Sequence, residues 1–164
     1  PVYLNADRER VAAVRVVPSG TVVVGTVLPW LTDSRHVELR GTAAFLARLA
    51  EQSAEWRSLR AEAAVGLCVA GDFNQDLLTS GHYYGSKDGR TALRNSLAAC
   101  GLDCLTAGPD DPFSGCTGLA SIDHIAVTGL KVVGRPRSQV WPAAGGLHDT
   151  LSDHYGVWAD LAVV

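Results

Sequence analysis

The chain of 164 residues is long enough for one domain with a hydrophobic core and too short for two domains of ordinary size. Its composition is that of a globular protein, and its net charge of −3 argues against a protein that grips long nucleic acid nonspecifically, because such proteins carry a basic face. No apolar stretch approaches the roughly 20 residues that span a bilayer, and no secretory leader is visible. We therefore expect a single domain over residues 1–164, with the cytoplasm as the favoured compartment and an N-terminal targeting segment left open.

The first half of the chain predicts a hairpin, a long helix and a buried strand. Two β-branched runs around a Pro-Ser-Gly turn indicate a hairpin from Val11 to Leu28. Residues 34–64 are the longest helix candidate, with Asp33 or Ser34 as the N-cap. One apolar stripe recurs along this helix, formed by Leu39, Leu46, Leu49, Trp56 and Leu59. The apolar run 65–71 then predicts a central strand.

The second half predicts a short helix and further strands. Residues 77–89 resemble a loop, and 90–100 form a short helix that Gly101 ends. Residues 135–153 are expected to be mostly irregular. Strands are predicted at three places: 102–106, 121–133 and 154–164. The order of these elements indicates an α+β protein, a mixed sheet covered by helices.

The four cysteines lack the spacing of a structural metal site. Cys68 lies in an apolar run and is interpreted as a small core residue. Cys104 and Cys116 flank a loop and could form a disulfide in an oxidising compartment.

Polar side chains occur at three predicted strand ends: Asp72 with Asn74, Asp123 with His124, and Asp153 with His154. Taken singly, each is explained by a turn or a cap. The ends of neighbouring strands converge on one rim of a sheet, so the groups can act together. Hydrolysis of a phosphoester needs oxygen ligands for a hard cation, a water that loses a proton, and a group that balances negative charge. The set therefore predicts a phosphoester hydrolase.

Three blocks in the same order carry a family resemblance: GDFN at 71–74, SIDHI at 121–125 and LSDHYGV at 151–157. They resemble the signature blocks of the endonuclease/exonuclease/phosphatase superfamily, and the segment 82–106 resembles a bacterial branch of it. The resemblance runs from about Arg10 to the C-terminus. It implies a DNase I-like β-sandwich flanked by helices, in four layers α/β/β/α. It also implies a phosphodiesterase, nuclease or phosphatase that uses Mg²⁺, with Mn²⁺ as an alternative cation.

The resemblance also implies a role for each matched residue. Asp72 would activate the attacking water, and Asn74 would hold a nonbridging phosphate oxygen. Asp153 would help to ligate the metal. His154 would contact the phosphate as an electrostatic or acid partner, while Asp123 fixes its ring through a hydrogen bond.

Three further residues are assigned from their positions alone. Tyr83 and Tyr84 lie in a glycine-flanked loop after Asp72, and we expect them to line a substrate cleft. His124 points to the opposite side of its strand from Asp123 by alternation, and is therefore interpreted as structural.

The chain departs from the family pattern in two respects. Where many members carry a phosphate-contacting His, this chain has Val27, so another donor such as Arg35, His36 or His82 must substitute. The first strands of the family fold, with their Asn and metal-binding Glu, have no counterpart before the hairpin. We therefore expect the chain to be the C-terminal two-thirds of a larger domain, N-terminally incomplete, with the missing segment cleaved, supplied by a partner chain or simply absent from this sequence. The loss of one carboxylate ligand would weaken Mg²⁺ binding and leaves the activity of the isolated chain open.

Two other readings remain open at this point. The chain could be a noncatalytic binding module that keeps the fold, as Val27 and the missing Glu suggest. It could instead hold zinc through a group in the segment HDTLSDH: His148, Asp149, Asp153 and His154. The substrate is not fixed by the sequence, although the acidic balance favours a small or membrane-derived phosphoester over duplex DNA. Trp56 and Trp158 are expected to pack in the core.

Overall fold

The structure is a computed structural model that describes residues 9–33, 38–114, 119–139 and 154–164. Its largest element is a mixed five-stranded sheet in the order β1-β2-β3-β5-β4. The strands are β1 (Val11–Arg15), β2 (Val22–Val27), β3 (Leu67–Asp72), β5 (Asp123–Thr128) and β4 (Asp103–Cys104). Strand β2 pairs with β1 in the predicted antiparallel hairpin and with β3 in parallel, while β5 lies antiparallel to β3.

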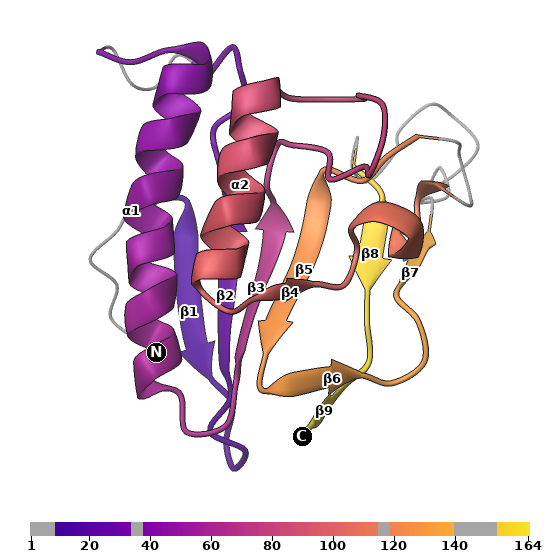
Figure 1. The fold of residues 1–164 in the computed structure, drawn as a ribbon. Helices are drawn as coiled ribbons and strands as arrows, with labels where there is room; N and C mark the ends of the chain where they lie inside the picture. The colour runs from indigo at the N-terminus through magenta and orange to yellow at the C-terminus, as the bar shows by residue number, and fades with distance from the viewer. Residues whose placement is uncertain (1–8, 34–37, 115–118, 140–153) are drawn as a thin grey trace, which may run out of the picture.

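Two helices, α1 (Gly41–Glu62) and α2 (Lys87–Ala99), lie together against one face of this sheet (Figure 1). Alternate strand residues point toward the helices, as the two-residue period of a strand requires. The resulting core contains Val22, Val24, Leu67, Val69, Phe45, Leu49, Trp56, Leu93 and Leu97. The ring of Trp56 is fully buried and stacks on Phe73 with centroids 6.0 Å apart, which confirms its predicted core position. The helices thus close one side of the sheet and leave polar groups at its rim.

Four short strands form two small ribbons after the main sheet. Strand β6 (Leu130–Val132) pairs with β9 (Leu161–Val163), and β7 (Arg137–Gln139) pairs with β8 (Gly156–Trp158), both antiparallel. A short 3₁₀ helix spans Gly108–Asp110. Of the helices in the described part of the chain, none is long and apolar enough to cross a membrane.

Both helices start at different residues from those predicted. Helix α1 begins at Gly41, and residues 38–40 before it are not helical. The carboxylate of Asp33, one of the two predicted N-caps, forms a buried ion pair with Arg10 instead of capping the helix. Leu39 is consequently outside the helix and 43% exposed. Helix α2 begins earlier than predicted, at Lys87, since the Oγ of Ser86 accepts a hydrogen bond from Gly89 N at 3.0 Å.

The C-terminal strands also differ from the prediction. The expected strands 121–133 and 154–164 are each divided in two, and β7 lies within the stretch predicted to be irregular. Trp158 is 37% exposed rather than a core residue, and its ring lies under the guanidinium of Arg137, 5.6 Å from the ring centroid. The prediction of a core position for Trp158 was wrong, because a two-stranded ribbon covers too little of a large ring to bury it.

Gly71 allows the close approach of β3 to β2 directly before the rim. Its φ is +143°, and a Cβ built on it would lie 2.0 Å from the backbone oxygen of Thr26. A contact this short with backbone cannot be relieved by a rotamer change. The residue before Asp72 must therefore be glycine, and this requirement fixes where the Asp72 backbone leaves the strand.

We expect Gly71→Ala to lower the free energy of unfolding by about 3 kcal/mol or more, since the new methyl group meets backbone in a disfavoured conformation. The matched control is Gly81→Ala. Gly81 also has a positive φ, of +82°, but a Cβ there has nothing within 4 Å. It should cost only about 1 kcal/mol of backbone strain. Urea unfolding of both variants measures the difference, and equal losses would contradict the steric argument.

Candidate active site

The candidate site lies at the rim where β3 ends and β5 begins. In the antiparallel β3–β5 pair, Asp72 is the register partner of Asp123. Directly paired residues project on the same face with Cβ atoms about 5 Å apart, so the two carboxylates face each other. On the other side of β3, Val27 is the parallel partner of Asp72. The position at which a family histidine was expected therefore borders the site with an apolar side chain.

Asp72 is held in place by the residue two positions later. Its Oδ1 accepts a hydrogen bond from Asn74 N at 2.8 Å, and its Oδ2 accepts one from Asn74 Nδ2 at 2.7 Å. Burial raises the pKa of Asp72 to about 6, and the charge of Asp123 adds to that rise, while the Asn74 hydrogen bonds and His154 oppose it. A carboxylate with a pKa near neutrality is suited to accept a proton from water.

Asn74 is placed mainly as a support for Asp72. It is 4% exposed, has a positive φ of 50°, and donates through Nδ2 to Leu28 O at 2.8 Å as well as to Asp72. An amide nitrogen has two hydrogens, and both are used by these two acceptors. The expected contact of Asn74 with a phosphate remains a prediction. If Nδ2 made this contact, it would have to give up its hydrogen bond to Leu28 O or to Asp72.

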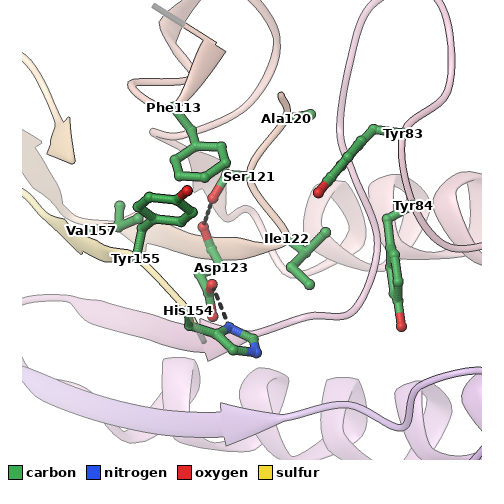
Figure 2. A pocket seen from close by; sticks show the side chains of 10 residues that line it. All are labelled: Tyr83, Tyr84, Phe113, Ala120, Ser121, Ile122, Asp123, His154, Tyr155 and Val157. Atoms are coloured by element: carbon green, nitrogen blue, oxygen red, sulfur yellow. Dashed lines mark hydrogen bonds and ion pairs between the residues drawn. The ribbon is translucent and has the colours of Figure 1, made fainter. Parts of the chain in front are cut away.

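His154 joins the site through the second carboxylate. Its Nδ1 lies 2.8 Å from Asp123 Oδ2, which is the carboxylate–imidazole hydrogen bond expected from the sequence (Figure 2). A carboxylate at Nδ1 favours the tautomer with a proton there and stabilises the charged ring. Asp123 therefore sets the orientation of the imidazole, and the Nε2 edge points away from the carboxylate.

A cavity of about 150 Å³ opens beside Asp123 and His154. In Figure 2, Tyr83 and Tyr84 lie on one side of it and Phe113 with Tyr155 on the other. Phe113 and Tyr155 pack edge to face with ring centroids 4.4 Å apart. The remaining lining residues are Ala120, Ser121, Ile122, Asp123, His154 and Val157. The structure thus brings the polar rim and an aromatic cavity together.

Tyr84 also lies close enough to Asp72 to feel its charge. Burial raises the pKa of its hydroxyl, and the negative charge of Asp72 raises it further. Tyr83 is 44% exposed and lies at the mouth of the cavity. The sequence singled out this tyrosine pair but missed Phe113 and Tyr155, whose rings meet only after folding.

His124 lies on the opposite face of β5, as alternation predicts. It is 1% exposed, and its ring nitrogens lie 3.0 Å from Thr106 Oγ1 and 3.0 Å from Gln75 O. Burial lowers the pKa of this ring. The interpretation of His124 as a structural residue is confirmed.

Some predicted residues lie outside the described residues: Arg35, His36, Cys116, His148, Asp149 and Asp153. The proposed metal ligand, the zinc alternative and the Cys104–Cys116 disulfide depend on them and stay predictions. Among the residues that are described, no group of three or more potential ligands forms a metal site. His82 is exposed, with Nε2 3.1 Å from Gly85 O, in the same loop as the tyrosine pair. Cys68 is buried in the core, as expected.

Comparison with known proteins places this geometry in a known fold. The chain matches no protein-family model and no curated protein. Its structure is similar to that of a 3′-5′ exonuclease, NExo, from Neisseria meningitidis, with a TM-score of 0.61 and 20% identity over 92% of this chain and 64% of that chain. A structure of the 3′ phosphatase NExo from Neisseria bound to product DNA hairpin gives 0.62 and 20%, over 93% of this chain and 65% of that chain.

An endonuclease/exonuclease/phosphatase from Beutenbergia cavernae matches with a TM-score of 0.52 and 20% identity, over 93% of this chain and 38% of that chain. This chain has the endonuclease/exonuclease/phosphatase fold. The DNase I-like α+β architecture expected from the sequence is confirmed. The chain spans about 64% of the first neighbour's length, and identities of 20% establish the fold rather than an activity.

The raised pKa of Asp72 predicts a pH-dependent stability. The pKa of about 6 in the folded chain exceeds the unfolded value of about 3.9, so stability is lost as pH rises from about 4 to about 6, and the loss then stays constant at higher pH. We expect Asp72→Asn to gain about 1 kcal/mol relative to the parent chain between pH 4.5 and pH 8, after allowance for partial exposure. The exposed Asp103→Asn serves as control. Denaturant unfolding at both pH values measures this gain, and a pH-independent difference would contradict it.

Proposed function

We propose that this protein hydrolyses phosphoesters at the rim of the β3–β5 pair. One observation carries the proposal: the register of two strands and one hydrogen bond bring Asp72, Asp123 and His154 together beside a cavity. These side chains come from segments far apart in the sequence. Each group taken alone has an ordinary structural explanation, whereas their convergence next to the cavity that Asp123 and His154 line does not.

The residues divide the chemistry between them. Ionised Asp72 accepts a proton from the attacking water, for which a pKa of about 6 leaves it available near neutral pH. His154 in its charged form stabilises the negative charge that develops on the phosphate oxygens. Asp123 keeps the ring oriented and favours that charged form. Asn74 fixes the direction of the Asp72 carboxylate through two hydrogen bonds.

The site also suits a hard cation. Burial and the facing charge of Asp123 raise the pKa of Asp72, and a divalent cation nearby would relieve the repulsion between the two carboxylates. Mg²⁺ is commonly held by one or two carboxylates, with water and substrate oxygens completing its shell. We propose that Asp153, the residue before His154 in the chain, helps to hold this cation beside the Asp72–Asp123 pair, with Mn²⁺ as a substitute cation. When bound, the cation would polarise the phosphoryl oxygen and stabilise the leaving group.

The substrate we favour is a terminal or small phosphoester. The cavity of about 150 Å³ admits one ring or sugar and excludes a base pair. The net charge of −3 does not favour extensive contact with a duplex backbone. The neighbour described as a 3′ phosphatase bound to product DNA hairpin supports a nucleic acid end as one such substrate.

We expect Asp72→Asn to reduce kcat on bis-para-nitrophenyl phosphate at least 100-fold, because the amide cannot accept the proton from water. His154→Gln should lose a similar factor by removing the charged ring. Asp103→Asn, an exposed acid on β4 of the same sheet, should keep the parent rate. Initial-rate measurements on the three variants test this, and an unaltered rate in Asp72→Asn would favour a noncatalytic binding module.

We also expect hydrolysis to depend on a divalent cation. A chelator such as EDTA should remove most of the activity, and Mg²⁺ or Mn²⁺ should restore it, because the proposed ligand Asp153 binds hard cations through carboxylate oxygen. Metal analysis and activity should be measured on the same preparation. If the protein contains one zinc ion per chain and Mg²⁺ fails to restore the activity after chelation, the zinc site would be supported instead.

A further inference from the structure

Asp76 is a buried carboxylate that the proposed chemistry does not use. It lies four residues after Asp72, and its side chain is 0% exposed. A buried ionised group is costly unless hydrogen bonds and opposite charge compensate it. The donors around Asp76 therefore indicate what the residue is for.

Four donors surround the Asp76 carboxylate. Its Oδ2 accepts hydrogen bonds from Tyr83 N and Tyr84 N, each at 2.9 Å. Its Oδ1 accepts from Leu78 N at 3.2 Å, and Arg90 Nη1 lies 3.3 Å away. Burial would raise the pKa of Asp76, but the three backbone donors and Arg90 outweigh it and lower the pKa. Asp76 is thus an anion at neutral pH, and its shortest hydrogen bonds come from the backbone N–H groups of Tyr83 and Tyr84.

Arg90 connects the same loop to helix α2. Besides Asp76, its Nη1 donates to Gly81 O at 2.9 Å. The loop ends at Ser86, whose N donates to Gln75 Oε1 at 2.9 Å and whose side chain caps α2. Asp76 N also donates to Tyr84 O at 3.3 Å. The loop that carries the tyrosines is therefore attached to α2 and to the segment behind Asp72.

The attached residues form one wall of the cavity. Tyr83 and Tyr84 lie across it from Phe113 and Tyr155 (Figure 2). A cavity of this size can hold a single aromatic ring, since about 150 Å³ is enough to bind benzene. Aromatic side chains on both sides of a flat ligand group gain stacking contacts with it. If the side formed by Tyr83 and Tyr84 became mobile, its share of these contacts would be lost.

We propose that Asp76 is a positioning residue: it holds Tyr83 and Tyr84 as a wall of the cavity, and this wall selects phosphoesters that carry a planar ring beside the phosphate. The selectivity rests on the proposed function of the neighbouring rim. Asparagine cannot replace Asp76, because one of its two positions would present an NH₂ group to the donors that the carboxylate now accepts.

The test compares the binding of phenyl phosphate and methyl phosphate by NMR titration, which does not depend on turnover. The parent chain should bind phenyl phosphate at least 10-fold more tightly. In Asp76→Asn this ratio should fall toward one while the Kd of methyl phosphate stays within about 2-fold. Arg90→Gln, which leaves the backbone donors in place, should give a smaller loss. Asp88→Asn, an exposed acid in the first turn of α2, should keep the parent ratio.

Two further measurements separate positioning from general destabilisation. Amide exchange at Tyr83 and Tyr84 should accelerate at least 10-fold in Asp76→Asn, while exchange in β3 stays slow. In a Tyr83→Ala/Tyr84→Ala background, Asp76→Asn should cause no further loss of phenyl phosphate binding, because the wall is already gone.

An unchanged phenyl-to-methyl ratio in Asp76→Asn, or a further loss in the double-alanine background, would overturn the proposal. If the parent chain binds neither phosphate, the proposed function and the selectivity fail together. In that case amide exchange still tests whether Asp76 holds the loop. Unchanged protection of Tyr83 and Tyr84 in Asp76→Asn would overturn this part of the proposal as well.

Discussion

The antiparallel register of β3 with β5 is the constraint on which the site depends. It places the last residue of one strand, Asp72, opposite the first residue of the other, Asp123. A slip by one residue would turn one carboxylate toward the helices, where the core has no partner for it. A backbone bond from Phe73 N to Ile122 O at 2.9 Å continues this register beyond the strand ends, and one from Leu28 N to Asp72 O at 2.9 Å does the same for β2 and β3. The placement of the two carboxylates at the rim is therefore a consequence of sheet pairing rather than of loop conformation.

The repulsion between the facing carboxylates of Asp72 and Asp123 is partly offset by neighbouring groups. Burial and Asp123 raise the pKa of Asp72, whereas the Asn74 hydrogen bonds and His154 lower it. The result is a carboxyl group with a pKa of about 6, which is mostly ionised at neutral pH. The buried layer underneath resists relaxation, because Phe73 packs between Trp56 and the fully bonded ring of His124. A rigid support of this kind lets the rim keep a charge arrangement that a loop would relieve by moving.

The sequence was sufficient where a pattern is local. Alternation placed His124 in the core, the β-branched runs predicted the hairpin, and three separate blocks located Asp72, Asp123 and His154. It failed where tertiary contacts decide. Asp33 pairs with Arg10 instead of capping α1, and Trp158 lies on a ribbon too narrow to bury it. Phe113 and Tyr155 come from distant segments and meet on one side of the cavity, and no spacing rule connects them.

The short segment after β3 links chemistry to selectivity. Asp72 lies at the rim opposite Asp123, Phe73 enters the core, and Asn74 orients Asp72. The side chain of Gln75 accepts a hydrogen bond from Ser86 N at the start of α2, and its backbone oxygen lies next to His124 Nε2. The carboxylate of Asp76 accepts hydrogen bonds from the backbone of the loop that carries Tyr83 and Tyr84. Because each side chain serves a different neighbour, the loop can change its sequence between its attachment points without disturbing the carboxylates. Under the proposed function, this arrangement would separate the residues that select a substrate from those that cleave it, although Asp72 and Asp76 are only four positions apart.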